Sequence, residues 1–446
     1  MKVSNRLLTL AAAAGCMALP ALAQGTAAPN TSVEEWLSTQ RKQTLQFWKF
    51  NDQRSVNVFE SPKVEGVEYK GFALEFGGAF TQQFQTIIHE NTATPVVVAG
   101  VNTNKLIEIG PGFNNATANL YIDGQLAKGV RMNLTLYLSS KHHNETWVKE
   151  GYVQFDGAPF AKKLLDGVFK DVTLKFGHME INYGDAHFRR SDNGQAIFNP
   201  LVGNLMMDGF TTQIGTELYY RPGNGVLAMV GATNGEIRGT VFTPNSREAA
   251  YLGKVGFDKM FNDVRFRLTG SFFSQSSSAN NTLYGGDRAG SRYNYVLENT
   301  RASSTGNAWS GNVDPLMKDR LTSMMINPFV RAGGFEFFGT YEQAKGRASS
   351  ETADRTFTQM ATEFVYRFAE NDKFFLAARW NDVKGDYLTA PGINVTRMQV
   401  GGGWFLTPSL MAKLEAVQQE WKNFPANDIR NGGKFKGVVL EAVISF

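Results

Sequence analysis

Apolar side chains recur at every second position along the last thirteen residues of the chain, Lys434 to Phe446. They are Val438, Leu440, Ala442, Ile444 and Phe446. In an extended strand, side chains two residues apart point to the same face, so this strand has one apolar face. Glu441 and Ser445 fall on the other face, which indicates contact with water. A strand with lipid on one side and water on the other is typical of a transmembrane β-barrel.

The same period of two recurs from Gly71 onward in about sixteen segments. These segments are Leu74–Phe80, Leu120–Leu126, Val130–Leu138, Trp147–Phe155, Val172–Phe176, Phe210–Tyr220, Val226–Val230, Tyr251–Phe257, Val264–Phe272, Leu321–Arg331, Phe335–Tyr341, Met360–Phe368, Phe374–Trp380, Met398–Trp404, Leu410–Ala416 and the terminal one. Pro328 makes the tenth the weakest placement, since proline removes a ladder donor. The pattern predicts an all-β fold, a transmembrane antiparallel β-barrel of about sixteen strands.

The connections between these segments alternate between short and long. With both chain ends in the periplasm, short turns are expected on that side and long loops on the external side. The stretch from Gly157 to Lys170 breaks the alternation, and its composition predicts a short helix at the periplasmic end. The Ser-, Asn- and Gly-rich stretch from Ser274 to Arg320 predicts a mobile external loop.

Composition agrees with this architecture. No run of about 18 apolar residues follows the N-terminus, which argues against a helical membrane protein. The mean hydropathy of −0.26 is compatible with a barrel, because lipid-facing and lumen-facing residues cancel along each strand. The 45 glycines and 34 phenylalanines suit tight turns and aromatic girdles. A net charge of +4 is too small to indicate nucleic acid as a partner.

The N-terminus has the pattern of a secretory signal peptide over residues 1–23. Lys2 and Arg6 are followed by an apolar stretch and by the small-x-small site Ala21-Leu22-Ala23. An alternative is a lipoprotein site at Cys16, although the apolar stretch before it is short. Cys16 is the only cysteine, so cleavage after residue 23 excludes disulfides and thiolate metal sites from the mature chain.

Residues 24–70 precede the barrel, which we expect to cover residues 71–446. Ser32 to Glu35 match a capping box, and Trp36, Leu37, Leu45, Phe47 and Trp48 follow. This pattern predicts a short periplasmic helix and then an extended linker through Pro62. A tether packed against the barrel is favoured over a plug or a partner-docking element.

In each strand, the positions that alternate with the apolar ones give the expected pore lining. Its charged residues are Arg131, Lys175, Arg221, Arg265, Arg267, Arg331, Arg367, Arg379, Arg397, Lys413, Glu75, Asp123, Glu217, Glu336, Glu363, Glu415 and Glu441. Each such charge on the lipid face would cost about 2–4 kcal/mol near the membrane midplane. The simpler alternative is that these groups pair across the lumen as a solvated face. Because both signs occur in similar numbers, strong ion selectivity is not expected.

The segment 182–209 is the best candidate for a pore constriction. Its charged residues are Asp185, His187, Arg189, Arg190 and Asp192, and apolar residues follow them. A loop folded into the lumen buries such apolar residues, whereas an outward loop exposes them. We expect the two arginines, opposed by the two aspartates, to set a transverse field across a narrow passage.

Motifs for catalysis, metals or cofactors are lacking in the sequence. His187 and Ser191 are neighbours in the candidate constriction, but no triad pattern accompanies them. We therefore expect neither an enzyme nor a bound cofactor.

Two segments carry a resemblance to a known family. Lys141 to Tyr152 and Lys175 to Asp185 resemble segments of the porin-like outer-membrane proteins of Bacteroidota, and more distantly the phosphate-selective porin O and P family. The resemblance at the level of the barrel covers nearly everything after Gly71. It implies a Gram-negative outer-membrane location. The final strand, which ends in Phe446, also resembles the closing strand of bacterial outer-membrane barrels, and this implies that Phe446 is read by the barrel assembly machinery. The basic residues that select phosphate in that family have no matching positions here.

The leading hypothesis is a porin for passive diffusion of small hydrophilic solutes, with a homotrimer as a candidate assembly. Its expected partners are outer-membrane lipid, the assembly machinery and these solutes. One alternative is a substrate-specific transporter in which the N-terminal segment forms a plug. Another is a structural or interaction barrel with a closed lumen.

Overall fold

The computed structural model describes residues 44–63, 67–114, 116–139, 146–190, 192, 194–203, 205–206, 211–236, 247–284 and 293–446. All of them belong to the compact unit formed by residues 44–446. The expected signal peptide, and the part of the predicted N-terminal helix before Thr44, lie outside these residues.

Most of the described residues belong to one 17-stranded antiparallel sheet, in which the two-residue strand β4 (Gly112–Phe113) is an addition to sixteen barrel strands. These strands are β1 (Ala73–Glu90), β5 (Thr117–Ala127), β6 (Val130–Ser139), β7 (Trp147–Phe155), β8 (Val172–Glu180), β9 (Thr212–Tyr220), β10 (Val226–Thr233), β11 (Ala250–Phe261), β12 (Val264–Gln275), β15 (Arg320–Ala332), β16 (Phe335–Arg347), β17 (Arg355–Phe368), β18 (Phe374–Tyr387), β19 (Ala390–Thr407), β20 (Leu410–Lys422) and β21 (Lys434–Ser445). Each corresponds to one predicted segment, so the prediction of a β-barrel of about sixteen strands is confirmed.

The barrel closes where the first strand meets the last. Strand β1 pairs with β21 from Ala79↔Ser445 to Glu90↔Lys434, and with β5 along its other edge. Beyond this ladder, the backbone N–H of Phe446 donates to the Gly78 carbonyl at 2.9 Å, and the return bond measures 3.0 Å. Glycine at position 77 permits this closure, because a Cβ there would lie 2.5 Å from the Phe446 carbonyl oxygen.

The two faces of the strands differ as the sequence predicted. On β21, Leu440 is 47% and Ile444 41% exposed, whereas Glu441 and Val443 point inward and are buried. Outward aromatic rings gather near one end of the barrel, where the rings of Phe368 and Phe374 stack at 5.7 Å. An apolar exterior with an aromatic girdle matches the requirements of a lipid environment.

Pro328 lies in β15, as predicted, and it locally interrupts the ladder. The pairing of β15 with β16 stops at Ile326↔Tyr341 and resumes at Phe329↔Phe338. In this gap the side-chain amide of Asn327 donates to the Gly339 carbonyl at 3.0 Å. A side chain thus replaces the donor that proline lacks.

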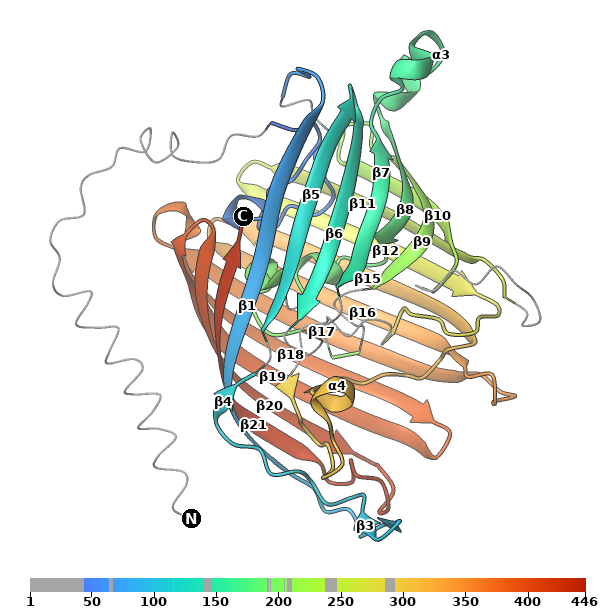
Figure 1. The fold of residues 1–446 in the computed structure, drawn as a ribbon, viewed down its shortest axis with the longest axis vertical. Coiled ribbons are helices and arrows are strands. Elements are labelled where there is room, and N and C mark those ends of the chain that lie inside the picture. Colours follow the sequence, from blue (N-terminus) through green and yellow to red (C-terminus); the bar gives the residue numbers. More distant parts are fainter. Residues whose placement is uncertain are drawn as a thin grey trace, which may run out of the picture. The chain divides into compact units, whose positions relative to one another are not determined.

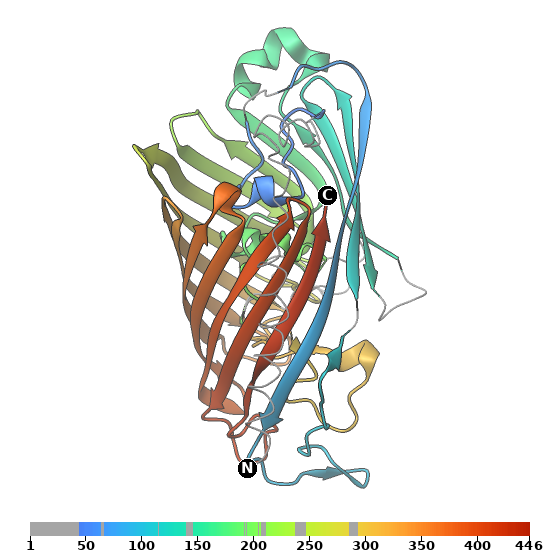
Figure 2. The same ribbon diagram turned by 90° about the vertical axis from the view of Figure 1, so that its left-hand side faces the viewer.

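The two ends of the barrel have different connections (Figures 1 and 2). One end carries short turns, the 3-10 helix η5 (Glu370–Asp372) and the longer connection with η2 (Pro159–Ala161) and α3 (Lys162–Phe169). The helix predicted between Gly157 and Lys170 is therefore confirmed. The other end carries longer connections, with β2 (Val97–Val98), β3 (Val101–Asn102), β13 (Tyr293–Asn294), α4 (Ser304–Asn307) and β14 (Trp309–Ser310). The turn between β18 and β19 is an exception at this end, because it is short.

The chain from Thr44 to Phe50 is not helical, so the predicted N-terminal helix is wrong for this part. Phe47 has a φ of 52°, which ends any right-handed helix there. The described residues 44–63 contain a single helical turn, the 3-10 helix η1 (Gln53–Ser55). Contacts with the barrel override local helix propensity in this segment.

No helix in the described part of the chain has the length and hydrophobicity needed to cross a membrane.

Candidate functional site

The candidate site is the interior of the barrel, which contains three segments in addition to the inward side chains. They are the N-terminal segment (residues 44–63), the inner loop (residues 181–190, 192, 194–203 and 205–206) and the described parts of the long connection 276–319. In each of them many side chains are buried, for example Phe59 at 2%, Leu205 at 0% and Tyr293 at 1% exposure. The connection predicted to be a mobile external loop is therefore packed in its described parts.

The N-terminal segment crosses the mouth at the end with the short turns (Figure 2). The backbone N–H of Gln46 donates to Gln125 on β5 at 2.8 Å, and that of Gln53 donates to the Pro408 carbonyl at 2.9 Å. Further along, Lys63 donates to the Val172 carbonyl at 2.7 Å. These partners lie at separate positions around the barrel, so the segment spans its opening.

The charges predicted to line the pore all come from the inward parity of the strands. Buried members are Asp123, Arg131, Glu217, Arg267, Glu336, Glu363, Arg367, Arg379, Arg397, Lys413, Glu415 and Glu441, and partly exposed members are Glu75, Lys175, Arg221, Arg265 and Arg331. The buried majority was expected to be hydrated. Most of its members instead contact the inserted segments or one another. Arg131 differs, because its Nε and Nη2 have no partner among the described residues.

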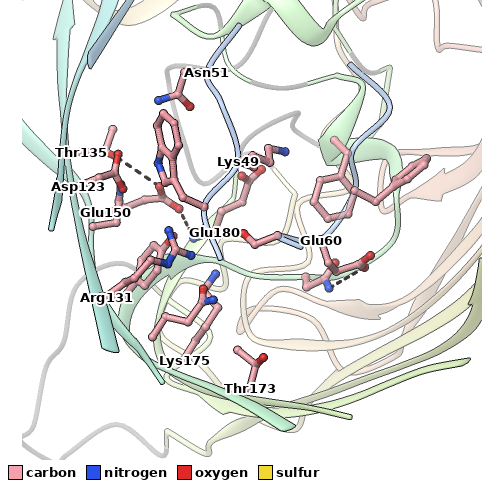
Figure 3. Close-up of a pocket in the computed structure, with 18 of the residues that line it drawn as sticks. Lys49, Asn51, Glu60, Asp123, Arg131, Thr135, Glu150, Thr173, Lys175 and Glu180 are labelled. Atoms are coloured by element: carbon pink, nitrogen blue, oxygen red, sulfur yellow. Dashed lines mark hydrogen bonds between the residues drawn. The ribbon is translucent and has the colours of Figure 1, made fainter. Parts of the chain in front are cut away.

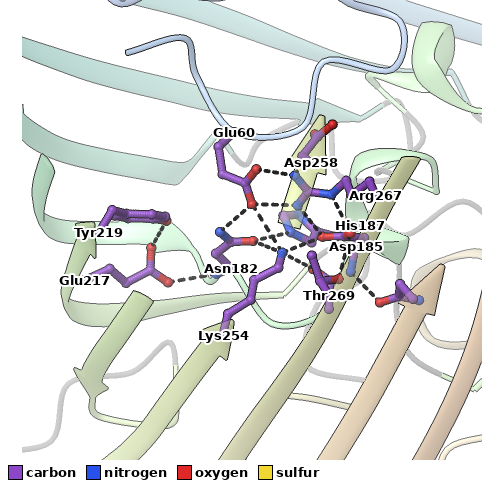
Figure 4. A network of polar contacts seen from close by, with 12 residues as sticks. Glu60, Asn182, Asp185, His187, Glu217, Tyr219, Lys254, Asp258, Arg267 and Thr269 are labelled. Atoms are coloured by element: carbon purple, nitrogen blue, oxygen red, sulfur yellow. Dashed lines mark hydrogen bonds and ion pairs between the residues drawn. The ribbon is translucent and has the colours of Figure 1, made fainter. Parts of the chain in front are cut away.

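Asp185 anchors the inner loop to the barrel (Figure 4). Its carboxylate receives two hydrogen bonds from the Arg267 guanidinium, at 2.8 and 2.9 Å, and pairs with the Lys254 ammonium at 2.6 Å. Thr269 donates a third hydrogen bond at 2.8 Å. Burial alone would raise the pKa of Asp185, but the two cations outweigh it and lower this pKa to about 2.

Arg267 also binds the N-terminal segment. Its guanidinium donates to both carboxylate oxygens of Glu60 at 2.9 Å. Burial opposes ionisation of Glu60, yet Arg267 and Lys254 hold the pKa of this carboxyl well below its usual range. One arginine on β12 therefore joins the barrel, the inner loop and the N-terminal segment.

Arg189 makes a second anchor of the same kind. It donates to Glu363 on β17 at 2.9 Å and to Glu336 on β16 at 3.1 Å. It also donates to the side chain of Asn57, which in turn donates to Glu336. The N-terminal segment and the inner loop thus share this carboxylate as well.

The remaining candidate constriction residues are also held by neighbours. The Arg190 guanidinium lies 5.6 Å from the Phe338 ring centroid, and burial, with Arg379 nearby, lowers the pKa of Arg190 to about 9. Asp192 pairs with Lys149 on β7. His187 lies 3.2 Å from Glu180, and its predicted neighbour Ser191 is outside the described residues.

The predicted transverse field is not the arrangement found in the described loop. Asp185 is neutralised by Arg267 and Lys254, and Arg189 by Glu336 and Glu363, so the loop charges face wall charges instead of one another. The alternation of inward and outward residues on β11 could have identified Lys254 as an inward-facing cation. Glu60 and Asn57 carry no comparable signal, because they belong to an irregular segment.

Apolar contacts fix the same loop. Its 3-10 helices are η3 (Ala186–Phe188) and η4 (Ala196–Phe198). Ile197 and Leu201 belong to a buried cluster with Phe375, Phe405 and Val443 of the barrel wall. We call the inward faces of β11, β12 and β15 to β21 the packed wall.

The inward faces of β5 to β9, which we call the cavity wall, border an open space (Figure 3). This cavity has a volume of about 170 Å³. Its polar lining includes Asp123, Arg131, Glu150 and Lys175 from the wall, and Lys49 faces them from the N-terminal segment. Burial lowers the pKa of Lys49 to about 8, against the opposing effect of Glu180.

No family model and no curated protein matches the chain. Among solved structures, the chain is similar to the anion-selective porin from Comamonas acidovorans, with 11% identity and a TM-score of 0.52 over 84% of this chain and 100% of that chain. It is also similar to the high-pH structure of OprB from Pseudomonas putida, with 10% identity and a TM-score of 0.50 over 84% of this chain and 94% of that chain. At such identities the likeness establishes the fold, which is that of outer-membrane β-barrels. The finer resemblance to Bacteroidota proteins stays a prediction.

Proposed function

We propose that this protein is an outer-membrane channel for passive diffusion of small hydrophilic solutes, narrowed by the inner loop. The observation that supports it is the division of side chains in a closed barrel. Leu440 and Ile444 face outward, whereas Glu441 between them faces inward. This division supports a polar pathway inside the barrel and an apolar surface against lipid.

The inserted segments make the passage narrow. The inner loop reaches β12 through Asp185 and β17 through Arg189, and the N-terminal segment spans the mouth. We therefore expect the channel to admit small solutes and to exclude larger ones.

Single-channel recording in planar bilayers tests this function. Removal of the six residues 189–194 should raise the conductance, because it eliminates the Arg189 anchor and shortens the loop. Removal of the six residues 348–353, in the connection between β16 and β17, is the matched control and should leave conductance unchanged. An unaltered conductance after the first deletion, with the barrel intact, contradicts a constriction at this loop.

The plugged transporter is the second candidate, and the path of the N-terminal segment favours it. Liposome swelling with graded sugars separates the two functions. The intact chain admits small neutral sugars if it is a porin and excludes them if residues 44–63 act as a plug. A variant that lacks residues 24–63 should admit sugars in both cases, so it reports whether the rest of the barrel is open.

The C-terminal aromatic is proposed as the signal for the assembly machinery. Phe446 is 51% exposed on the outer face, while its backbone closes the barrel. Phe446→Ala retains the backbone bonds, so a lower yield of folded barrel in cells, with normal refolding in detergent, supports a recognition role. Cross-linking of the membrane-embedded protein tests the proposed homotrimer.

A further inference from the structure

The cavity wall carries two cations in one row across three strands. Arg131 on β6 is directly opposite Gln154 on β7, which is opposite Lys175 on β8. Adjacent strands lie about 4.8 Å apart, so the Cα atoms of the two cations are separated by about 10 Å. Both side chains line the cavity, as Figure 3 shows.

Arg131 is a buried guanidinium with unused donors. Its exposure is 3%, and among the described residues neither its Nε nor its Nη2 has a hydrogen-bond partner. Elsewhere in the lumen, Arg189 binds two carboxylates and Arg267 binds three. Buried donors without partners are costly, so their retention beside a cavity points to a ligand that supplies acceptors.

Lys175 provides a second positive group, and its direct cross-strand neighbour Glu217 on β9 forms no ion pair with it. Its ammonium lies 4.3 Å from the Tyr152 ring centroid, and no carboxylate of the described residues lies within ion-pair distance. The indole of Trp48 and the ring of Tyr121 also line the cavity and offer it apolar surface. The positive row therefore lies beside a surface that suits a short carbon chain.

A negative group lies two rows further along the wall, beyond the row of Asn133 and Tyr152. Glu150 on β7 accepts a hydrogen bond from the Glu180 backbone N–H at 2.8 Å and one from Thr135 at 3.5 Å. Its side chain also lines the cavity. A solute with both an ammonium group and an acceptor group could contact Glu150 with the first and the two cations with the second.

We propose that the cavity binds small solutes through a carboxylate held by Arg131 and Lys175. A planar guanidinium matches the two oxygens of a carboxylate, and such charge-assisted bonds satisfy both unused donors. The carboxylate can belong to a simple organic acid or to an amino acid, whose ammonium would face Glu150. This inference rests on the proposed function, since it names the solute class of the same channel.

Calorimetric titration of the purified full chain in detergent tests the proposal with three solutes of similar size. Propionate and β-alanine carry the carboxylate, and propionamide is the neutral analogue of propionate. Propionate should bind, and propionamide should bind at least tenfold more weakly. Arg131→Gln should weaken propionate binding by about tenfold or more, since it removes a charge-assisted pair. Arg131→Lys should give an intermediate loss, because it keeps the charge without the planar fork.

Arg331→Gln is the matched control. Arg331 is another inward arginine, but it pairs with Asp372 at 2.6 Å and does not line the cavity. Its variant should bind propionate as the parent does. Glu150→Gln distinguishes the two sources, because it should weaken β-alanine and spare propionate if the solute is an amino acid, and spare both if it is a simple acid.

Equal affinity for propionate and propionamide, no binding of propionate, or unchanged binding by Arg131→Gln would each overturn the proposal. Conductance in potassium chloride, measured on the same preparation, separates this result from the proposed function. A conducting barrel that does not bind propionate refutes the site alone. A barrel that binds propionate but does not conduct refutes the channel alone.

Discussion

The packed wall and the cavity wall have similar outer faces, but their inner faces hold different kinds of side chain. The packed wall presents Phe329, Phe338, Phe375 and Val443, on which the inserted segments pack. The cavity wall presents polar groups and tyrosines, and a space remains in front of it. One sheet therefore supplies both a support for the loop and a surface open to solutes.

The same residue type has a different role on each wall. Arg267 on the packed wall binds two carboxylates from two inserted segments. Arg131 on the cavity wall is equally buried, but two of its donors are unused. Buried charge is therefore paired with carboxylates at Arg267, whereas at Arg131 it keeps unused donors, as the proposed solute site requires.

Replacement of Arg267 should give the largest effect. Arg267→Leu leaves Glu60 and Asp185 buried with Lys254 as their remaining cation, which should cost about 3–5 kcal/mol of folding free energy. Urea unfolding of the refolded barrel measures it. Arg265→Leu, two residues away on β12, is the control, because Arg265 is partly exposed and Arg267 remains to pair with Asp258, so its loss should cost less than that of Arg267. Equal losses for the two variants would contradict the role of Arg267.

Charges on the outer face should have similar effects on both walls. Phe176 on β8 is 64% and Leu440 on β21 is 47% exposed. Phe176→Arg and Leu440→Arg should each cost up to about 2–4 kcal/mol in lipid, and less toward the membrane interfaces. Unfolding in vesicles and in detergent provides the comparison. A penalty at one position only would show that the two walls do not face lipid equally.

Acid should weaken the packed wall through Asp185. Its folded pKa of about 2 lies below the ordinary value of 3.8, so the stabilisation is complete above about pH 4 and disappears as the pH falls through 2. The contribution is on the order of 2 kcal/mol. Protease cleavage of the inner loop, followed from pH 5 to pH 2, should rise in this window. Asp185→Asn should abolish that rise, and an unaltered rise would assign it to other groups.

Replacement of Arg131 should have the smallest effect on stability. It should leave the free energy of unfolding unchanged or raise it slightly, whereas replacement of Arg267 lowers it. Arg131→Leu removes a buried charge without leaving a carboxylate unpaired, so the free energy of unfolding should change by less than about 1 kcal/mol or increase. The urea measurement used for Arg267→Leu applies here too. A loss as large as that of Arg267→Leu would show that Arg131 supports the fold.

Much of the barrel could be predicted from the alternation of apolar and polar residues, but the contacts inside the lumen could be predicted only in part. Alternation identified all sixteen strands, including β15 with its proline, and it placed Arg131 and Lys175 on the inner face. It did not reveal that the N-terminal segment crosses the mouth, because Thr44 to Phe50 has the composition of a helix and takes its conformation from the barrel. The partners of Asp185 and Arg189 were also missed, since a loop has no periodicity from which to derive them.

The sequence by itself determined which side chains face lipid and which face the lumen, because a strand has a fixed period of two and a misplaced charge is costly in a membrane. Only the tertiary structure decided which charges pair. Arg267 meets Asp185 from 82 residues away and Glu60 from 207 residues away. Such pairs depend on barrel closure and on the paths of the inserted segments, and these are properties of the whole chain.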